Sequence, residues 1–234
     1  MNQPAPSSVW TRPRPEPRRQ APGVDQYVAA ALAVADAEGL DAVSMRRVAG
    51  DLGSGTATLY RYIVNRDELV DLMVDAVQGE VRLPEPAPDW RSGLGAIAHA
   101  LRAIMLRHPW LAGELAGRPS LGPNSLRWSE CALRAAVALT PDITRASQAL
   151  GTVHAYVLGS VATQQAAHRA EQRTGLTVEQ WQRSVDPYIS DVIAAGEHPM
   201  LARRVLEAEE PDPEIEFTFG LECVLDGLEA RLGR

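Results

Sequence analysis

Hydroxyl, aromatic and arginine side chains gather between positions 44 and 66 in a pattern that suits contact with nucleic acid. Short hydroxyls and guanidinium groups hydrogen-bond to base edges, while tyrosine hydroxyls and the N–H groups at a helix start suit phosphate oxygens. The side chains that carry this chemistry are Ser44, Arg46, Thr56, Thr58, Tyr60, Arg61, Tyr62 and Arg66. Four arginines against one aspartate give the stretch a local charge of +3, although the whole chain carries −7. We therefore expect a DNA contact here.

Two short helices joined by a tight turn would have to present these side chains. Helical periodicity and N-cap residues predict helices over 45–52 and 56–63. Ala49 is small where the two helices would cross, and Gly53 can take the positive φ that a tight turn requires. Leu59 would hold the second of these helices on the core. This spacing predicts a helix-turn-helix.

The flanking segments predict two longer helices. Apolar periodicity begins at Val24 and ends at Gly39, and Asn65 with Glu68 reads as a capping box for the next helix. Arg66 lies in the first turn of that helix, where a cation is unfavourable to the helix dipole. We therefore expect Arg66 to act outside the helix, on a phosphate.

Prolines mark a boundary after this helix. Three of them within 84–88 end the helical pattern. We divide the chain into a disordered Arg- and Pro-rich arm over 1–22, a helix-turn-helix domain over 23–83, and a helical domain for effector binding and dimerisation over 84–234. The four arginines between 12 and 19 either follow a minor groove or belong to an ordinary disordered tail.

The rest of the chain has helical periodicity with almost no period-2 alternation. We expect helices near 90–107, 110–116, 123–139, 142–171, 177–195 and 213–232. The stretch 196–212 is the least defined. The predicted fold class is all-α, with an N-terminal three-helix helix-turn-helix domain for DNA binding and a C-terminal helical domain for ligand binding and dimerisation.

The C-terminal half offers a dimer face and a ligand pocket. Apolar stripes in 149–161 and 215–232 could form a four-helix bundle between two copies, or an ordinary core within one chain. A small-molecule site would lie between helices. Its candidate lining residues are Leu101, Met105, Trp110, Leu115, Trp128, His154, Val157 and Gln164. Tryptophan or methionine at helical spacing also fits a core, and His154 also fits a hydrogen-bonded core histidine.

Three pieces of the first half resemble the TetR family of regulators. They are Ser44-Met-Arg-Arg-Val-Ala-Gly-Asp-Leu-Gly53, Thr56-Ala-Thr-Leu-Tyr-Arg-Tyr62 and Asn65-Arg-Asp-Glu-Leu69. Residues 219–228 resemble the last helix of the tetracycline-repressor class. The resemblance implies a homodimeric repressor that binds an operator in double-stranded DNA and is released by a small hydrophobic effector. It places Arg46, Thr56, Ala57 and Thr58 against base edges, and Ser44, Tyr60, Tyr62 and Arg66 mainly at phosphates. For Arg61, base and phosphate both stay open.

Other function classes find little support in the sequence. No catalytic motif or zinc-ligand spacing occurs, and the two cysteines, Cys131 and Cys223, are far apart. No apolar run approaches the roughly 20 residues that span a bilayer. We expect a cytoplasmic protein that is not an enzyme and has no cofactor and no membrane partner; the sequence identifies no metal-ligand residues and leaves a metal requirement open. Two alternatives stay open: a TetR-like activator, or a helical small-molecule-binding or scaffold protein without DNA function.

Overall fold

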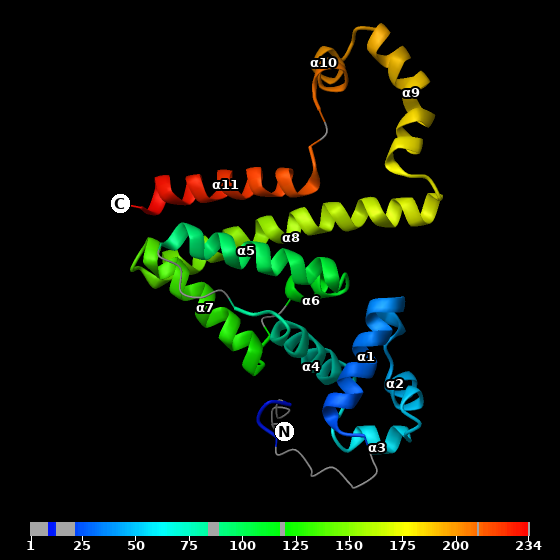
Figure 1. Ribbon diagram of the computed structural model, residues 1–234, viewed down its shortest axis with the longest axis vertical. Helices are drawn as coiled ribbons and strands as arrows, with labels where there is room; N and C mark the ends of the chain where they lie inside the picture. The colour runs from blue at the N-terminus through cyan, green and yellow to red at the C-terminus, as the bar shows by residue number, and fades with distance from the viewer. Residues whose placement is uncertain (1–8, 13–21, 84–88, 118–119, 210, 234) are drawn as a thin grey trace, which may run out of the picture.

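The computed structural model describes residues 9–12, 22–83, 89–117, 120–209 and 211–233, and all regular secondary structure among them is helical. Helices α1 to α11 follow one another along this part of the chain, with a short 3₁₀ helix, η1, after α1. A small N-terminal bundle and a larger C-terminal bundle meet along α4 (Figure 1). The all-α prediction is confirmed.

The N-terminal bundle buries its apolar faces around a compact core. Its elements are α1 (Val24–Glu38), η1 (Leu40–Ala42), α2 (Met45–Asp51), α3 (Thr56–Tyr60) and α4 (Arg66–Gly79). Tyr27, Leu59 and Met73 are fully buried between them. The predicted N-caps form: Ser44 accepts the N–H of Arg47 at 3.2 Å, and Asn65 accepts the N–H of Glu68 at 2.8 Å. Each cap satisfies a helix-start N–H that would otherwise lack a partner.

The C-terminal bundle is built on four long helices. Its elements are α5 (Trp90–Arg107), α6 (Leu111–Leu115), α7 (Pro123–Leu139), α8 (Ile143–Thr174) and α11 (Pro213–Leu232). Helix α5 packs against α7 and α8, and α11 runs beside α8 (Figure 1). Leu94, Val157 and Leu221 are buried where these helices meet. The core therefore lies between α5, α7, α8 and α11.

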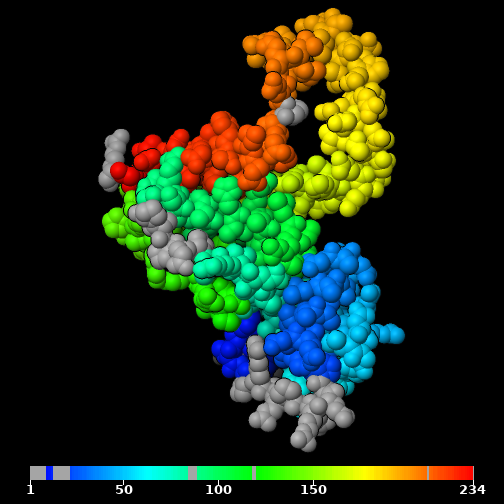
Figure 2. Space-filling model, viewed as in Figure 1, coloured from blue at the N-terminus to red at the C-terminus, as the bar shows by residue number. Residues whose placement is uncertain are grey.

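Helices α9 (Val178–Ala194) and α10 (Pro199–Glu207) form an arm that stands clear of the bundle in Figures 1 and 2. Neither helix has a buried residue. The exposed fraction is 54% for Trp181 and 73% for Leu206. The sequence left 196–212 without a predicted helix, but Pro199 begins α10 because the first position of a helix needs no N–H.

Two helix ends differ from the sequence-based bounds. Helix α3 ends at Tyr60, and the chain turns at 61–62 instead of continuing to residue 63. Helix α8 continues to Thr174 and ends where Gly175 takes a φ of +70°. Glycine adopts this left-handed conformation without the Cβ clash that other residues meet. The actual ends therefore follow local backbone geometry that the apolar periodicity does not encode.

A buried carboxylate joins the two bundles. Asp75 on α4 is 5% exposed, and its Oδ1 accepts the N–H groups of Asn124 and Ser125 at 2.8 and 2.9 Å. These N–H groups open α7, so a side chain of the N-terminal bundle caps a helix of the C-terminal one. A Cβ built on Gly122 would lie 2.2 Å from the same carboxylate oxygen. The close approach of α4 to α7 therefore needs glycine at this position.

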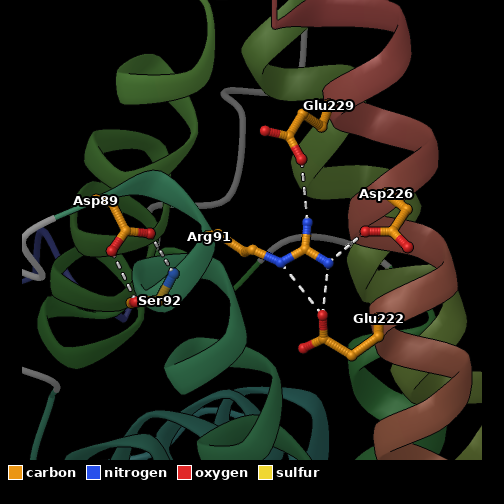
Figure 3. Close-up of polar contacts among 6 residues, drawn as sticks. All are labelled: Asp89, Arg91, Ser92, Glu222, Asp226 and Glu229. Carbon is orange, nitrogen blue, oxygen red and sulfur yellow. Dashed lines mark hydrogen bonds and ion pairs between the residues drawn. The ribbon is translucent and has the colours of Figure 1, made fainter.

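Arg91 ties the start of α5 to the C-terminal half of α11 (Figure 3). Its guanidinium donates to Glu222 and Asp226, each at 2.5 Å, and to Glu229 at 3.3 Å. Hydrogen bonds to Glu222 and then Asp226 raise the pKa of Arg91 above its ordinary value. The three carboxylates are more than half exposed, so the cluster fixes the helix orientation more than it stabilises the fold.

Replacing Asp75 should loosen the joint between the bundles. Asp75→Ala leaves the first N–H groups of α7 buried without an acceptor, and we expect a loss of about 2–3 kcal/mol in the free energy of unfolding. Urea unfolding measures it, with the exposed Asp41→Asn as the control. A loss no larger than that of the control would contradict the role of Asp75.

Candidate nucleic-acid interface and ligand cavity

The turn between α2 and α3 has the geometry of a helix-turn-helix. Gly53 takes a φ of +60°, and the N–H of Ser54 donates to the carbonyl of Ala49 at 2.9 Å. The hydroxyls of Ser54 and Tyr27 lie 2.6 Å apart, which fastens the turn to α1. Leu59, fully buried, holds α3 against the same core. Residues predicted to shape the turn do so here.

At the start of α2, Ser44 and Arg46 are exposed to solvent, whereas Arg47 forms ion pairs. Arg46 is exposed and has no ion-pair partner among the described residues. Arg47 instead pairs with Glu38 at 2.8 Å and Asp51 at 3.0 Å. The hydrogen bond to Glu38, followed by that to Asp51, raises the pKa of Arg47. Ser44 is exposed beside Arg46, as an anion-facing helix start requires.

On α3, the predicted contact residues lie partly or fully open to solvent. Ala57 and Arg61 are exposed, Tyr60 is 50% exposed, and Thr56 and Thr58 are half-buried. They lie at the end of the molecule opposite the α9–α10 arm (Figure 1). This surface offers hydroxyl and guanidinium donors and has no acidic side chain between Thr56 and Arg66. These donors suit contacts with the base edges and phosphates of a DNA duplex.

Tyr62 and Arg66 correct two expectations from the sequence. Tyr62 is 6% exposed and packs near Tyr27, and its hydroxyl is buried without a partner among the described residues. Arg66 donates to the backbone carbonyls of Val43 at 2.9 Å and Leu40 at 2.7 Å. The turn after α3 directs Tyr62 inward, and Arg66 binds two carbonyls at the turn between η1 and α2, of which the Leu40 carbonyl also accepts the N–H of Val43 at 3.1 Å. Neither side chain faces outward as expected.

The structure describes only Val9–Arg12 and residues 22–23 of the segment before α1. Residues 1–8 and 13–21, including three of its four arginines, lie outside the described residues. Val9 is 7% exposed, and Arg12 donates to Glu68 at 2.6 Å. The Glu68 carboxylate also accepts the N–H of Val64 at 2.9 Å, one residue before the position that a capping box uses. The expectation of disorder is therefore wrong for Val9–Arg12.

A cavity of about 130 Å³ lies in the C-terminal bundle, with walls from α4, α5, α6, α7 and α8. Four of the eight predicted pocket residues line it: Leu101, Leu115, Trp128 and His154. The sequence analysis missed its other lining residues, which are Gln78, Ile97, Ala98, Ser129, Ala132, Leu150 and Val153. Most are small or branched apolar residues whose periodicity indicates only burial.

The other four predicted pocket residues lie elsewhere. Met105 and Val157 are fully buried in the main core. Trp110 donates its indole N–H to Asp36 at 2.8 Å, and Gln164 accepts from Arg102 at 3.1 Å. The structure does not place them in the cavity, because each has its partner in the core or at a helix junction.

Trp128 connects the cavity wall to α4. Its indole N–H donates to the carbonyl of Gln78 at 3.1 Å, and the Gln78 side chain accepts from Ser125. The cavity therefore borders the last turn of α4, the helix that belongs to the N-terminal bundle. The sequence placed Trp128 in a pocket but gave no sign of this bond.

A second polar junction joins the corner between α5 and α6 to the N-terminal bundle. His108 places Nδ1 2.8 Å from Asp36 on α1 and Nε2 3.2 Å from Glu80 at the end of α4. Trp110 donates to the same Asp36 oxygen, and Arg107 pairs with Glu80 at 3.3 Å. This junction joins segments more than 70 residues apart in sequence, and no local signal could have found it.

His154 contributes a buried, unpaired ring nitrogen to the cavity wall. Its Nε2 is buried and has no hydrogen-bond partner in the described part of the chain. Burial lowers the pKa of His154, because a charged imidazole is unfavourable against apolar walls. The ring is therefore neutral near pH 7. The described residues contain no cluster that could hold a metal ion.

Among the described residues, no helix combines the length and the apolar character needed to cross a membrane.

Two family models together match most of the chain. The model for bacterial regulatory proteins of the tetR family matches residues 28–73. The model for the tetracyclin repressor-like C-terminal domain matches residues 83–232. The first match contains the helix-turn-helix, and the second contains α5 to α11.

Individual relatives agree with these matches. The HTH-type transcriptional repressor DrrR1 of Streptomyces coeruleorubidus is 38% identical over 225 residues, which cover 94% of this chain and 83% of that protein. The class A tetracycline repressor protein from transposon 1721 of Escherichia coli is 28% identical, covering 87% and 89%. The crystal structure of the TetR family protein ActR of Streptomyces coelicolor with actinorhodin superposes with a TM-score of 0.74 at 32% identity, covering 92% of this chain and all of that one.

The burial of His154 predicts a pH-dependent stability. Its pKa is lower in the folded than in the unfolded chain, so the unfolded chain binds more protons near the ordinary histidine pKa of about 6.5. Stability should therefore fall as pH drops from about 7.5 to 5.5. Urea unfolding at the two pH values should show a smaller fall for His154→Leu than for the unsubstituted protein. The exposed His168→Leu, on the same helix, should behave like the unsubstituted protein; equal falls in all three would contradict the prediction.

Proposed function

This chain belongs to the TetR family of bacterial regulatory proteins, and we propose that it is a transcriptional repressor that binds operator DNA as a homodimer and is released by a small hydrophobic effector. One observation carries the proposal: the cavity in the C-terminal bundle borders α4, and its wall residue Trp128 is bonded to Gln78 on that helix. A molecule that enters the cavity thus acts on the DNA-binding half directly.

The DNA contacts follow from the exposed side of the helix-turn-helix. Helix α3 enters a major groove, as the second helix of this motif does. Arg46, Thr56, Ala57 and Thr58 face base edges. Ser44 and Tyr60 hold phosphates, and Arg61 lies where it reaches either. The exposed surface of α3, which has no acidic side chain, supports this assignment, whereas the buried Tyr62 and the hydrogen-bonded Arg66 serve the fold instead.

The dimer forms through α8 and α11. Phe219 and Ile215 on α11 are 72% and 65% exposed in the single chain. Large apolar side chains gathered on one face of a soluble protein mark an interaction surface. Two copies joined there form a four-helix bundle and present two α3 helices to one side of a duplex, about 34 Å apart.

Release is a shift between two arrangements of the same helices. The effector favours the arrangement in which its cavity is larger, and it moves the equilibrium only as far as its affinities for the two differ. Trp128 passes the change to α4, and the His108 junction passes it to α1. A ligand-bound structural relative, ActR with actinorhodin, supports this kind of control. The relatives' names describe regulators rather than enzymes.

Substitutions on the helix-turn-helix should weaken operator binding. Arg46→Gln and Thr58→Ala each remove a contact to a base edge, which costs about 1–3 kcal/mol of binding free energy. A gel shift with the DNA upstream of the protein's own gene, at two salt concentrations, measures the change. Arg134→Gln, an exposed arginine on α7, is the control. Binding equal to the control in both variants would contradict the contacts, and no shift of the unsubstituted protein at low salt would contradict DNA binding.

A charge on the α11 face should break the dimer. Phe219→Glu places two carboxylates in an apolar interface without partners, so we expect a monomer that binds operator at least tenfold more weakly. Sedimentation velocity measures the mass, and Val137→Glu on α7 is the matched control. A Phe219→Glu protein that stays dimeric would show that the interface lies elsewhere.

A further inference from the structure

We propose that the cavity selects a neutral hydroxyaromatic ligand, with a ring against Trp128 and a hydroxyl hydrogen-bonded to His154 Nε2. The inference rests on the proposed function, since it names the ligand class of the same cavity. It draws on three features of the wall: its lack of charged side chains, the buried and unpaired Nε2 of His154, and the cavity volume.

The wall excludes charged ligands. None of the lining residues is aspartate, glutamate, arginine or lysine. A cation or an anion in the cavity would lose its hydration without gaining a counter-charge, which is strongly unfavourable. The histidine does not change this, because burial lowers the pKa of His154 and the ring is neutral. The ligand part that enters the cavity is therefore uncharged.

The hydrogen-bonding state of the wall residues indicates where a polar group of the ligand should lie. The Trp128 N–H is used by Gln78, and the Ser129 hydroxyl donates to the carbonyl of Ser125 at 3.0 Å. His154 Nε2 is buried and unpartnered. A neutral imidazole nitrogen either donates or accepts, depending on its tautomer. A ligand hydroxyl can pair with both tautomers, whereas a carbonyl pairs only with the donor form. The geometry thus favours a hydroxyl at this point.

The volume of the cavity and its apolar lining residues favour a ligand part with a single aromatic ring. The cavity holds about 130 Å³, and an engineered apolar cavity of about 150 Å³ binds benzene. Trp128 supplies an aromatic surface, and Leu101, Leu150 and Val153 supply aliphatic ones. A larger ligand would seat one ring here and displace Trp128, the residue bonded to α4.

The pair phenol and toluene tests the inference, because the two molecules differ by a hydroxyl against a methyl of nearly equal size. Ligand-observed NMR titration of the full chain gives both dissociation constants. The ratio of the toluene constant to the phenol constant should fall roughly tenfold in His154→Leu, the loss expected for one buried hydrogen bond. His154→Gln keeps a polar nitrogen near the same place and should retain most of the preference. His168→Leu, on the same helix, should retain all of it.

The outcomes separate this inference from the proposed function. If both probes bind and the ratio is the same in His154→Leu and His168→Leu, His154 does not select a hydroxyl and the inference fails. If neither probe binds while the protein still shifts operator DNA, the cavity is not a ligand site and the inference fails with it, although the DNA-binding function stands. Should His154→Leu not fold, an unchanged ratio in His154→Ala would overturn the inference equally.

Discussion

The contact between Asp75 and the start of α7 is the constraint on which the arrangement of the two bundles depends. A buried carboxylate has to find donors, and the first N–H groups of a helix have to find an acceptor. Asp75 meets both needs at once, at 2.8 and 2.9 Å, across the border between the bundles. Helix α4 is therefore a structural part of both halves, since it packs against α1 in one and against α7 in the other.

The contact between α4 and α7 links the cavity to the DNA-binding half. An apolar hole inside an isolated bundle would bind a ligand without consequence for DNA. Here Gln78 lies within one helical turn of Asp75 on α4, and Trp128, which donates to the Gln78 carbonyl, lies within one turn of Ser125 on α7. The α5–α6 corner adds a separate route, because His108 and Trp110 both reach Asp36 on α1, and α1 holds the helix-turn-helix through Tyr27 and Ser54. Two helices of the DNA-binding half, α1 and α4, are thus hydrogen-bonded to the effector-binding half.

Local chemistry explains which parts could be predicted from the sequence. The caps at Ser44 and Asn65 and the turn at Gly53 depend on residues within a few positions, so they could be predicted from the sequence. The intramolecular contacts of Tyr62 and Arg66 were not predicted, because Tyr27 and the carbonyls of Leu40 and Val43 lie more than 20 residues away. The pocket prediction mixed cavity and core for the same reason: apolar periodicity shows that a residue is buried, not whether a space lies beside it.

The α9–α10 arm and α11 expose apolar side chains that a single chain does not cover. A helix as apolar on one side as α9 gains little stability by itself in water, since most helical stability comes from packing that face. Yet no residue of α9 or α10 is fully buried in the single chain, and Phe219 on α11 is 72% exposed. The sequence therefore encodes apolar surface beyond the needs of one copy. A second copy that covers this surface would hold each α8–α11 pair in place, and through α8 it would fix the wall that carries His154.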